Sequence, residues 1–340
     1  MSRTRLLVTR IALLAALAAF VSGAAGASVN GRSGVGGGVR TLLSLKGPVY
    51  AFAQDRDEIV WETSDPGCGQ TVRMRKVAAG STVHTLTTPG GATCDGGEID
   101  YWAPLLAVAG ASALWETGLA ALTYVDVDVY VGSPGTKDRM VDIEETSYGQ
   151  NESPPDFDGL IVPIVGQGSM LAYAPGQVWR IVNRKPVRVA GLRGATALAT
   201  DGSRLAVAET LSAHQAQVVV QGGATIAGLS PTAIALSGNT MAALAGGAIK
   251  LYDAASGRLQ RTVRVPAATL PSVSLSGEKL VFAVRHERHS AIELLDTRTG
   301  SLSMLAVVPG SPLGLSIVDH RVAWGENSGR RGWIKAIQLG

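Results

Sequence analysis

The sequence predicts an all-β fold, a seven-bladed β-propeller of four-stranded antiparallel blades in which an N-terminal strand closes the last blade. Three observations lead to this prediction. A short motif recurs seven times, the repeats contain four strand-like segments, and one further strand-like segment precedes the first repeat. Repeats of about 40 residues with four short strands each are typical of propeller blades.

The recurring motif is an apolar pair followed by a large or apolar residue. It occurs in the segments "DEIVWE", "ASALWE", "GSMLAYA", "GSRLAVAE", "GNTMAALA", "GEKLVFAV" and "DHRVAWGE". The equivalent positions are Ile59, Ala113, Leu171, Leu205, Met241, Leu280 and Val322, which are separated by 54, 58, 34, 36, 39 and 42 residues. The last four spacings fit one blade each, and the first two indicate blades that carry insertions.

The order of strands within a repeat is clearest in the fifth. The segment 232–236 ("TAIAL") is followed by a Ser-Gly-Asn turn, and further strands are predicted over 240–244, 249–253 and 259–265. Ser, Gly and Asn are residues that tight turns favour. Because a four-stranded sheet cannot bury both of its faces alone, neighbouring repeats are expected to stack around an axis.

Large side chains on the second strands are predicted to fill the gap between neighbouring blades, which widens away from the axis. This explains why an apolar pair is so often followed by a large residue. The residues concerned are Trp61, Trp115, Tyr173, Phe282 and Trp324.

Both ends of the chain support closure of the ring. The segment 39–45 ("VRTLLSL") has no repeat of its own, and the last repeat stops one strand short. Pairing of 39–45 with 333–339 would complete the seventh blade and cover an exposed edge. One segment allows another interpretation: 103–114 ("APLLAVAGASAL") has the apolar content of a buried helix, although Gly110 and the alternation that follows favour strands.

The first 27 residues have the order of a secretory signal peptide. Three arginines precede an apolar run over 11–21, and Ala25-Gly26-Ala27 offers small residues for cleavage before Ser28. The alternative is a retained anchor, but the run is shorter than the roughly 20 residues that span a bilayer. We therefore expect a single propeller domain over 28–340 that is secreted, periplasmic or part of the cell envelope, with no membrane span after cleavage.

The composition and the cysteines agree with an exported β protein. Hydrophobic residues make up 46% of the chain, charged residues only 17%, and 42 residues are glycine, which suits short strands and turns better than long charged helices. Cys68 and Cys94 are predicted to form one disulfide bond in an oxidising compartment, and two free buried thiols are the alternative. Residues 28–160 carry 9 basic and 18 acidic side chains, whereas residues 161–340 carry 18 basic and 9 acidic ones. The chain after the predicted signal peptide is therefore neutral overall, and no nucleic-acid partner is expected.

The ends of the third strands, "LYDAASG" and "LLDTRTG", resemble those of the TolB-like and YVTN families of bacterial seven-bladed propellers and, more distantly, WD40 repeats. The resemblance covers 166–340 well and 47–159 weakly. The chain lacks the Ser-Pro-Asp-Gly turn of TolB-type repeats, where "LSGE", "LSGN" and "TDGS" stand instead, and it lacks the Gly-His and Trp-Asp pairs of WD40 repeats. These motifs imply a fold that hosts many functions, so they assign no catalytic residue.

Three groups of residues are candidates for binding. In "TYVDVDVYVG", Asp126, Asp128 and Tyr130 share one face of a predicted strand, with successive side chains roughly 6.6–6.8 Å apart. Such carboxylates could bind a cation or a basic group, or act as acid and base, whereas an exposed strand face is the simpler reading. The other two groups are Asp156 and Asp158 in a long acidic insertion and His286 and His289 in the "RHERHS" turn.

No nucleophile elbow, P-loop, dinucleotide fingerprint or CxxC motif occurs. The sequence therefore predicts no cofactor, no metal site and no catalytic residue. The predicted function is that of an exported, monomeric binding protein or scaffold for a protein, peptide or glycan. The alternative is a propeller hydrolase or lyase whose acidic residues converge at the mouth of the channel.

Overall fold

The computed structural model describes residues 37–64, 70–87, 106–121, 124–136, 139–141, 164–166, 168–174, 177–189, 192, 195–212 and 215–340. All of them belong to one compact unit, Gly34–Gly340. The predicted signal peptide, both cysteines, Asp156 and Asp158 lie outside the described residues.

The described residues form seven sheets of four antiparallel strands, which confirms the predicted architecture. Blade 1 consists of β2 (Val49–Gln54), β3 (Glu58–Ser64), β4 (Gln70–Lys76) and β5 (His84–Thr87). Blade 2 consists of β6 (Leu106–Ala109), β7 (Ser112–Ala121), β8 (Tyr124–Gly132) and β9 (Arg139–Val141). Blade 3 consists of β10 (Ile164–Gly166), β11 (Met170–Ala174), β12 (Gln177–Val182) and β13 (Lys185–Val189). Blades 4 and 5 consist of β14 (Ala195–Thr200), β15 (Leu205–Ser212), β16 (Gln215–Val220) and β17 (Thr225–Ala227); and β18 (Ala233–Ser237), β19 (Thr240–Ala245), β20 (Ala248–Asp253) and β21 (Leu259–Arg264). Blades 6 and 7 consist of β22 (Thr269–Ser276), β23 (Lys279–Arg285), β24 (His289–Asp296) and β25 (Leu302–Pro309); and β26 (Leu313–Val318), β27 (Arg321–Ser328), β28 (Arg331–Gln338) and β1 (Arg40–Leu45).

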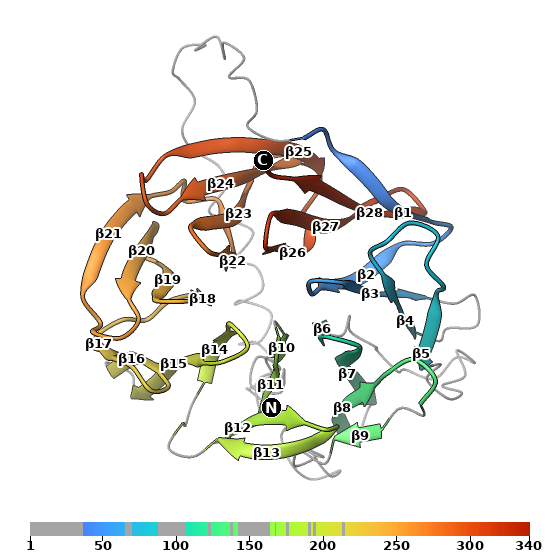
Figure 1. Ribbon diagram of the computed structural model, residues 1–340, viewed down its shortest axis with the longest axis horizontal. Coiled ribbons are helices and arrows are strands. Elements are labelled where there is room, and N and C mark those ends of the chain that lie inside the picture. Colours follow the sequence, from blue (N-terminus) through green and yellow to red (C-terminus); the bar gives the residue numbers. More distant parts are fainter. Residues whose placement is uncertain are drawn as a thin grey trace, which may run out of the picture. The chain divides into compact units, whose positions relative to one another are not determined.

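The seven sheets close into a ring around an axis (Figure 1). The first strand of each blade contacts the first strands of both neighbouring blades, and β26 of the last blade contacts β2 of the first. In blades 1 to 6 the strands run outward in chain order, so the first strand lines the axis and the fourth lies at the rim (Figure 1). In blade 7 the order from the axis is β26, β27, β28 and β1.

The strand β1 completes the seventh blade, as the sequence predicts. It pairs antiparallel with β28, with Arg40 opposite Ala336 and Leu45 opposite Gly332. The order of this sheet is β1-β28-β27-β26, so both ends of the domain contribute to one blade. The alternative of a helix over 103–114 is wrong where the chain is described, since β6 and the start of β7 pair as a hairpin around Gly110.

The core is divided among the interfaces between blades. Trp115 packs with residues of blades 1 and 2, Phe282 lies between blades 5 and 6, and Trp324 lies between blades 6 and 7. Trp61 fills the interface at which blade 7 meets blade 1. The predicted role of these four large residues is therefore confirmed, while the side chain of Tyr173 lies outside the described ones.

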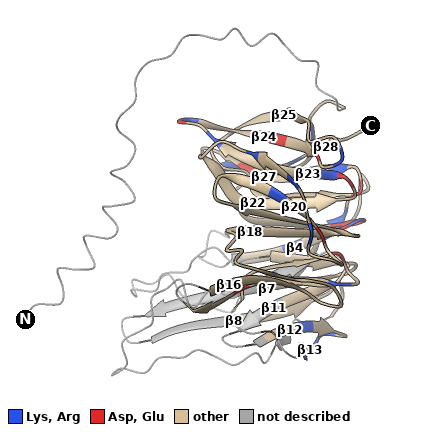
Figure 2. Cartoon of the chain, turned by 90° about the vertical axis from the view of Figure 1, so that its left-hand side faces the viewer, with Lys and Arg blue, Asp and Glu red and all other residues tan. Residues whose placement is uncertain are grey.

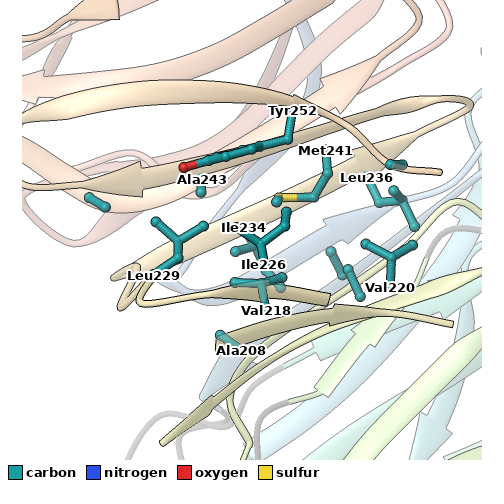
Figure 3. Packing of buried hydrophobic residues seen from close by; sticks show 14 residues of the cluster. Ala208, Val218, Val220, Ile226, Leu229, Ile234, Leu236, Met241, Ala243 and Tyr252 are labelled. Carbon is teal, nitrogen blue, oxygen red and sulfur yellow. The ribbon is translucent and has the colours of Figure 1, made fainter. Parts of the chain in front are cut away.

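Figure 3 shows one such interface, between blades 4 and 5. Met241, Leu236 and Tyr252 of blade 5 pack against Val218 and Val220 of blade 4. The two blades are thereby held together by a shared apolar core.

The ring has two faces that differ in their loops. One face carries the turns between the first and second strands and between the third and fourth strands of each blade, and we call it the turn face. The opposite side, with the second-to-third turns and the connections between blades, we call the connection face. Figure 2 shows the ring from the side, with several acidic and basic positions along its right-hand edge.

Candidate functional site

Hydrogen bonds between the first turns of neighbouring blades fix the turn face. Each bond joins a side chain in the turn of one blade to the turn of the next blade. The described examples are Asp55 Oδ2 with the Gly110 N–H (2.7 Å), Ser169 Oγ with Thr200 Oγ1 (3.0 Å) and Ser237 Oγ with the Gly277 N–H (2.9 Å).

Arg321 makes the corresponding joint between the last and the first blade. Its Nε donates to Oε1 of Gln54 (2.7 Å), and its terminal nitrogens donate to the carbonyl oxygens of Asp55 (2.6 Å) and Arg56 (3.1 Å). Gln54 in turn donates to the carbonyl oxygens of Ser316 (3.0 Å) and Arg321 (3.3 Å). The seam of the ring is thus the most densely hydrogen-bonded of these joints.

The channel along the axis contains a cavity of about 340 Å³. The first strands of blades 1, 2, 4, 5, 6 and 7 line it. Its polar groups include Gln54, Thr200, Ser272, Ser274 and Ser316, and no charged side chain is among the described residues that line it. The described lining of the channel therefore offers hydroxyl, amide and backbone groups for hydrogen bonding.

Two larger cavities lie side by side on the turn face between blades 1 and 2. One has a volume of about 550 Å³ and the other about 440 Å³, and three residues, Glu58, Lys76 and Ala111, line both. We call the two together the charged basin. The first cavity is also lined by Asp55, Arg56, Asp57, Val77, Ala78, Gly110 and Arg321, and the second by Ser81, Thr82, His84, Ser133 and Pro134.

Several of the charged groups in the basin already have partners. Arg56 Nε lies 3.1 Å from Oδ2 of Asp319, and both side chains are largely exposed. The guanidinium of Arg321 is used by the three oxygens named above, and the two carboxylate oxygens of Asp55 accept from the backbone N–H groups of Arg56 and Gly110.

Glu58 differs from these groups because most of its side chain is buried, while its carboxylate, which keeps accessible surface in the cavities, has no partner among the described residues. Its relative exposure is 8%, and no residue in the described part of the chain donates a hydrogen bond to its carboxylate or forms an ion pair with it. Burial raises the pKa of Glu58, an effect that Lys76 and His84 oppose and Asp57 reinforces. Lys76 stands directly opposite Glu58 in the β3–β4 ladder, yet the two side chains form no ion pair.

The basin therefore presents two carboxylates, Asp57 and Glu58, and one ammonium group, Lys76, that have no partner among the described residues. Burial partly desolvates the Glu58 carboxylate, and charges attract more strongly at such a site than in open solvent, so a ligand that supplies an opposite charge is favoured there. The arrangement can bind a molecule that carries both a basic and an acidic group.

The structure places the sequence-predicted residues elsewhere. Asp126 and Asp128 lie on β8 opposite Leu119 and Thr117, and their side chains are outside the described ones. Tyr130, on the same strand, is half-buried and stacks on Trp115, with ring centroids 6.0 Å apart and an interplanar angle of 12°.

His286 and His289 come together at the tip of the β23–β24 hairpin. Their rings stack with centroids 4.7 Å apart at 20°, and the His286 N–H donates to the His289 carbonyl (2.8 Å). Both histidines are exposed and lie on the connection face, away from the charged basin. Within the described ranges, no group of three His, Cys, Asp or Glu side chains is arranged to hold a metal ion.

Sequence reasoning missed Glu58 and its neighbours. The available signal was the run of four charged residues "DRDE" at 55–58 in the first turn, where the fifth repeat has "SGN" and the sixth "SGE". The run alone does not show whether its carboxylates bind a ligand or are simply solvated in an exposed turn. The side chains that complete the basin come from three other turns and from blade 7, which the sequence does not bring together.

The comparisons with known proteins concern the fold. No protein-family model matches the chain, and no curated protein sequence matches it. Among solved structures, a chain of a mitotic checkpoint complex is similar, with a TM-score of 0.51 and 14% identity over 94% of this chain and 97% of that one. The computationally designed protein Ika8 (TM-score 0.48, 13% identity, 88% and 99% covered) and Hsv2 of Kluyvelomyces marxianus (0.45, 10%, 85% and 97%) also match. At such identities the similarity shows the β-propeller fold alone. No helix among the described residues is long and apolar enough to cross a membrane.

Proposed function

We propose that this protein is an exported, non-catalytic propeller that binds a segment of another protein at the charged basin on its turn face. The order of the first 27 residues and the pair of cysteines support export to an oxidising compartment, in the cell envelope or outside the cell. The resemblance of the third-strand ends to TolB-like and YVTN repeats supports a bacterial origin. A chain of the same fold forms part of a mitotic checkpoint complex, which is consistent with a scaffold role.

The observation that carries the proposal is the charged basin itself. Two adjoining cavities, of about 550 and 440 Å³, meet at an unpaired acid and an unpaired base. No Trp, Tyr or Phe side chain is among the described residues that line them, and charged groups predominate over neutral amides. A peptide segment, which can carry acidic and basic side chains together, matches this lining better than a neutral glycan.

The scaffold beneath the basin supports binding without a large rearrangement. Asp55 ties blade 1 to blade 2 through the Gly110 N–H, and Arg321 ties blade 7 to the backbone beside it. A binding site whose groups are already held in place loses less entropy when its ligand binds.

Selection from a random peptide library tests the proposal. The purified secreted chain is used as bait, and the affinities of the enriched peptides are compared between wild type and Ala111→Trp, which places a bulky side chain in both cavities. Glu278→Trp, in the corresponding turn of blade 6, is the matched control. We expect Ala111→Trp to weaken binding at least tenfold and Glu278→Trp to leave it unchanged. Peptides that bind equally to all three chains, or no enrichment at all, would refute a partner site at the basin.

Export is tested separately by expressing the full chain and sequencing the N-terminus of the extracytoplasmic product. We expect cleavage before Ser28, and a peptide in which Cys68 and Cys94 are linked in the non-reduced digest. A chain that stays in the cytoplasm with its first residues intact would contradict the export proposal but would leave the binding site untouched.

A further inference from the structure

We propose that the carboxylate of Glu58 binds the ammonium or guanidinium group of a lysine or arginine side chain in the partner. This inference rests on the proposed function, because it names the chemistry by which the charged basin recognises its segment. It assigns a ligand class to a carboxylate that makes no hydrogen bond or ion pair within the described part of the chain.

The first argument is the state of Glu58. Its side chain is 8% exposed and lines both cavities of the basin, yet no group in the described part of the chain pairs with it. Buried charged groups in folded proteins are nearly always paired or hydrogen-bonded. Of the other three buried glutamates in the described ranges, Glu209 accepts a hydrogen bond from Gln217, and Glu326 contacts Trp324 and Lys335. The third, Glu62, has no partner among the described residues, but it is enclosed in the protein, whereas Glu58 lines a cavity.

The second argument is that no basic side chain forms an ion pair with Glu58 in the described part of the chain, although Lys76 and His84 are near enough to lower its pKa. Arg56 pairs with Asp319, and the guanidinium of Arg321 is occupied by Gln54 and two backbone oxygens. Lys76 is exposed and forms no ion pair with Glu58. The lining carries three acids (Asp55, Asp57, Glu58) and three bases (Arg56, Lys76, Arg321), and Asp319 adds a fourth acid as the partner of Arg56. The resulting excess of one negative charge favours a ligand that carries a basic group.

The third argument is the lining beside the carboxylate. Val77, Ala78 and Ala111 line the larger cavity together with Glu58 and Lys76, and they present apolar atoms to it. The methylene stem of a lysine or arginine can lie along such a surface while its charged head reaches an acid. Lys76 then remains free to meet an acidic group elsewhere in the same segment. Charge-assisted hydrogen bonds of this kind are shorter and roughly twice as strong as neutral ones.

The test repeats the library selection on Glu58→Gln, which keeps the shape of the side chain and removes its charge. We expect peptides enriched on the wild type to share a lysine or arginine at one fixed position, and this preference to disappear on Glu58→Gln. In measured affinities, replacing that basic residue by norleucine should cost wild type at least tenfold and cost the variant little.

A second variant tests the role of Glu58 independently, in case Glu58→Gln fails to fold. In Ala111→Lys an ammonium group is placed on the blade 2 wall of the basin, where it can pair with Glu58 from within the protein. We expect this chain to be more stable to heat than Ala111→Leu and to lose peptide binding, whereas Ala111→Leu keeps part of it.

The outcomes separate the two proposals. Peptides that are blocked by Ala111→Trp but contain no fixed basic residue, or a basic preference that persists on Glu58→Gln, would overturn the role of Glu58 and leave the basin as the binding site. If no enriched peptide responds to Ala111→Trp, both the site and the role of Glu58 are refuted.

Discussion

Arg321 donates its Nε–H to Oε1 of Gln54 over 2.7 Å, although the two residues are 267 positions apart in the chain. The bond joins the second strand of the last blade to the first strand of the first blade. The strand pair β1–β28 closes the same ring at its rim. Closure is therefore secured near the axis by side chains and at the rim by a backbone ladder.

We predict that Arg321→Lys lowers the free energy of unfolding by about 2 kcal/mol, because a lysine cannot reach three acceptors at once and leaves part-buried oxygens unpaired. Urea unfolding monitored by fluorescence measures the loss. Arg330→Lys, an exposed position in the turn before β28, is the matched control and should change stability little. Equal effects of the two substitutions would mean that the seam does not depend on Arg321.

The two tryptophans at the interfaces of blade 7 differ in one hydrogen bond. Trp324 and Trp61 are both fully buried at equivalent positions of their repeats. Trp324 Nε1 donates to Oε2 of Glu326 (3.0 Å), whereas Nε1 of Trp61 has no acceptor among the described residues.

We predict that Trp324→Phe destabilises the protein by about 1–3 kcal/mol more than Trp61→Phe. Both substitutions remove the same atoms. Trp324→Phe, however, deprives the buried Glu326 carboxylate of a hydrogen-bond donor, whereas Trp61→Phe removes a buried N–H that has no acceptor among the described residues. Thermal and urea unfolding of the two variants give the comparison. A larger loss for Trp61→Phe would show that packing volume, rather than hydrogen bonding, distinguishes the two sites.

Gly314 marks the closest approach between the last and first blades. Its φ is +58°, and a Cβ atom at this position would lie 1.8 Å from the carbonyl oxygen of Phe52. Gly310 has a similar φ of +67°, but a Cβ atom there would meet nothing within 4 Å.

We predict that Gly310→Ala costs about 1–2 kcal/mol, the price of the left-handed conformation alone. Gly314→Ala should cost several kcal/mol more, since β26 must move away from β2 to admit the methyl group. The expression yield and melting temperature of the two variants measure the difference. Similar values for both would show that the backbone at Gly314 can shift without opening the seam.

The fold was predictable because its signals are local and repeated. The apolar pair followed by a large residue marks the second strand of each blade, and turn residues such as those at 237–239 mark the ends of strands. The spare segment at the start and the missing strand at the end predicted the pairing that β1 makes with β28. The roles of Trp61, Trp115, Phe282 and Trp324 followed from their place on the second strands.

The candidate site was not predictable to the same degree, because it depends on convergence. Glu58 and Lys76 are neighbours through strand pairing, but Ala111 reaches them from another blade and Arg321 from the far end of the chain. Whether an acid is buried and lacks a partner depends on side chains that no local pattern specifies. The sequence drew attention instead to Asp126 and Asp128, whose alternation is a local signal, and to His286 and His289, which are adjacent in a turn. Their part in binding stays a prediction.

Glu62 on β3 supplies the last prediction, a dependence of stability on pH. Its side chain has no exposed surface, and neither of its carboxylate oxygens has a hydrogen-bond partner among the described residues. It follows Val60 by two positions on β3, and Val60 packs against blade 2. Burial raises the pKa of Glu62 to about 9 from an ordinary value of 4.5, so the acid is protonated in the folded protein near neutral pH.

The direction of the effect follows from this shift. The folded state holds a proton that the unfolded state releases, so the contribution of Glu62 to stability is fully present below about pH 4.5 and falls as the pH rises toward 9. The free energy of unfolding should fall by at most about 1.4 kcal/mol per pH unit because of this one group. Glu62→Gln removes the titrating group, so its free energy of unfolding should fall less than that of the wild type between about pH 5 and pH 8. Urea unfolding across this range measures both curves, with the exposed Glu278→Gln as control. Parallel curves for wild type and Glu62→Gln would show that Glu62 is ionised in the folded protein and has found a partner.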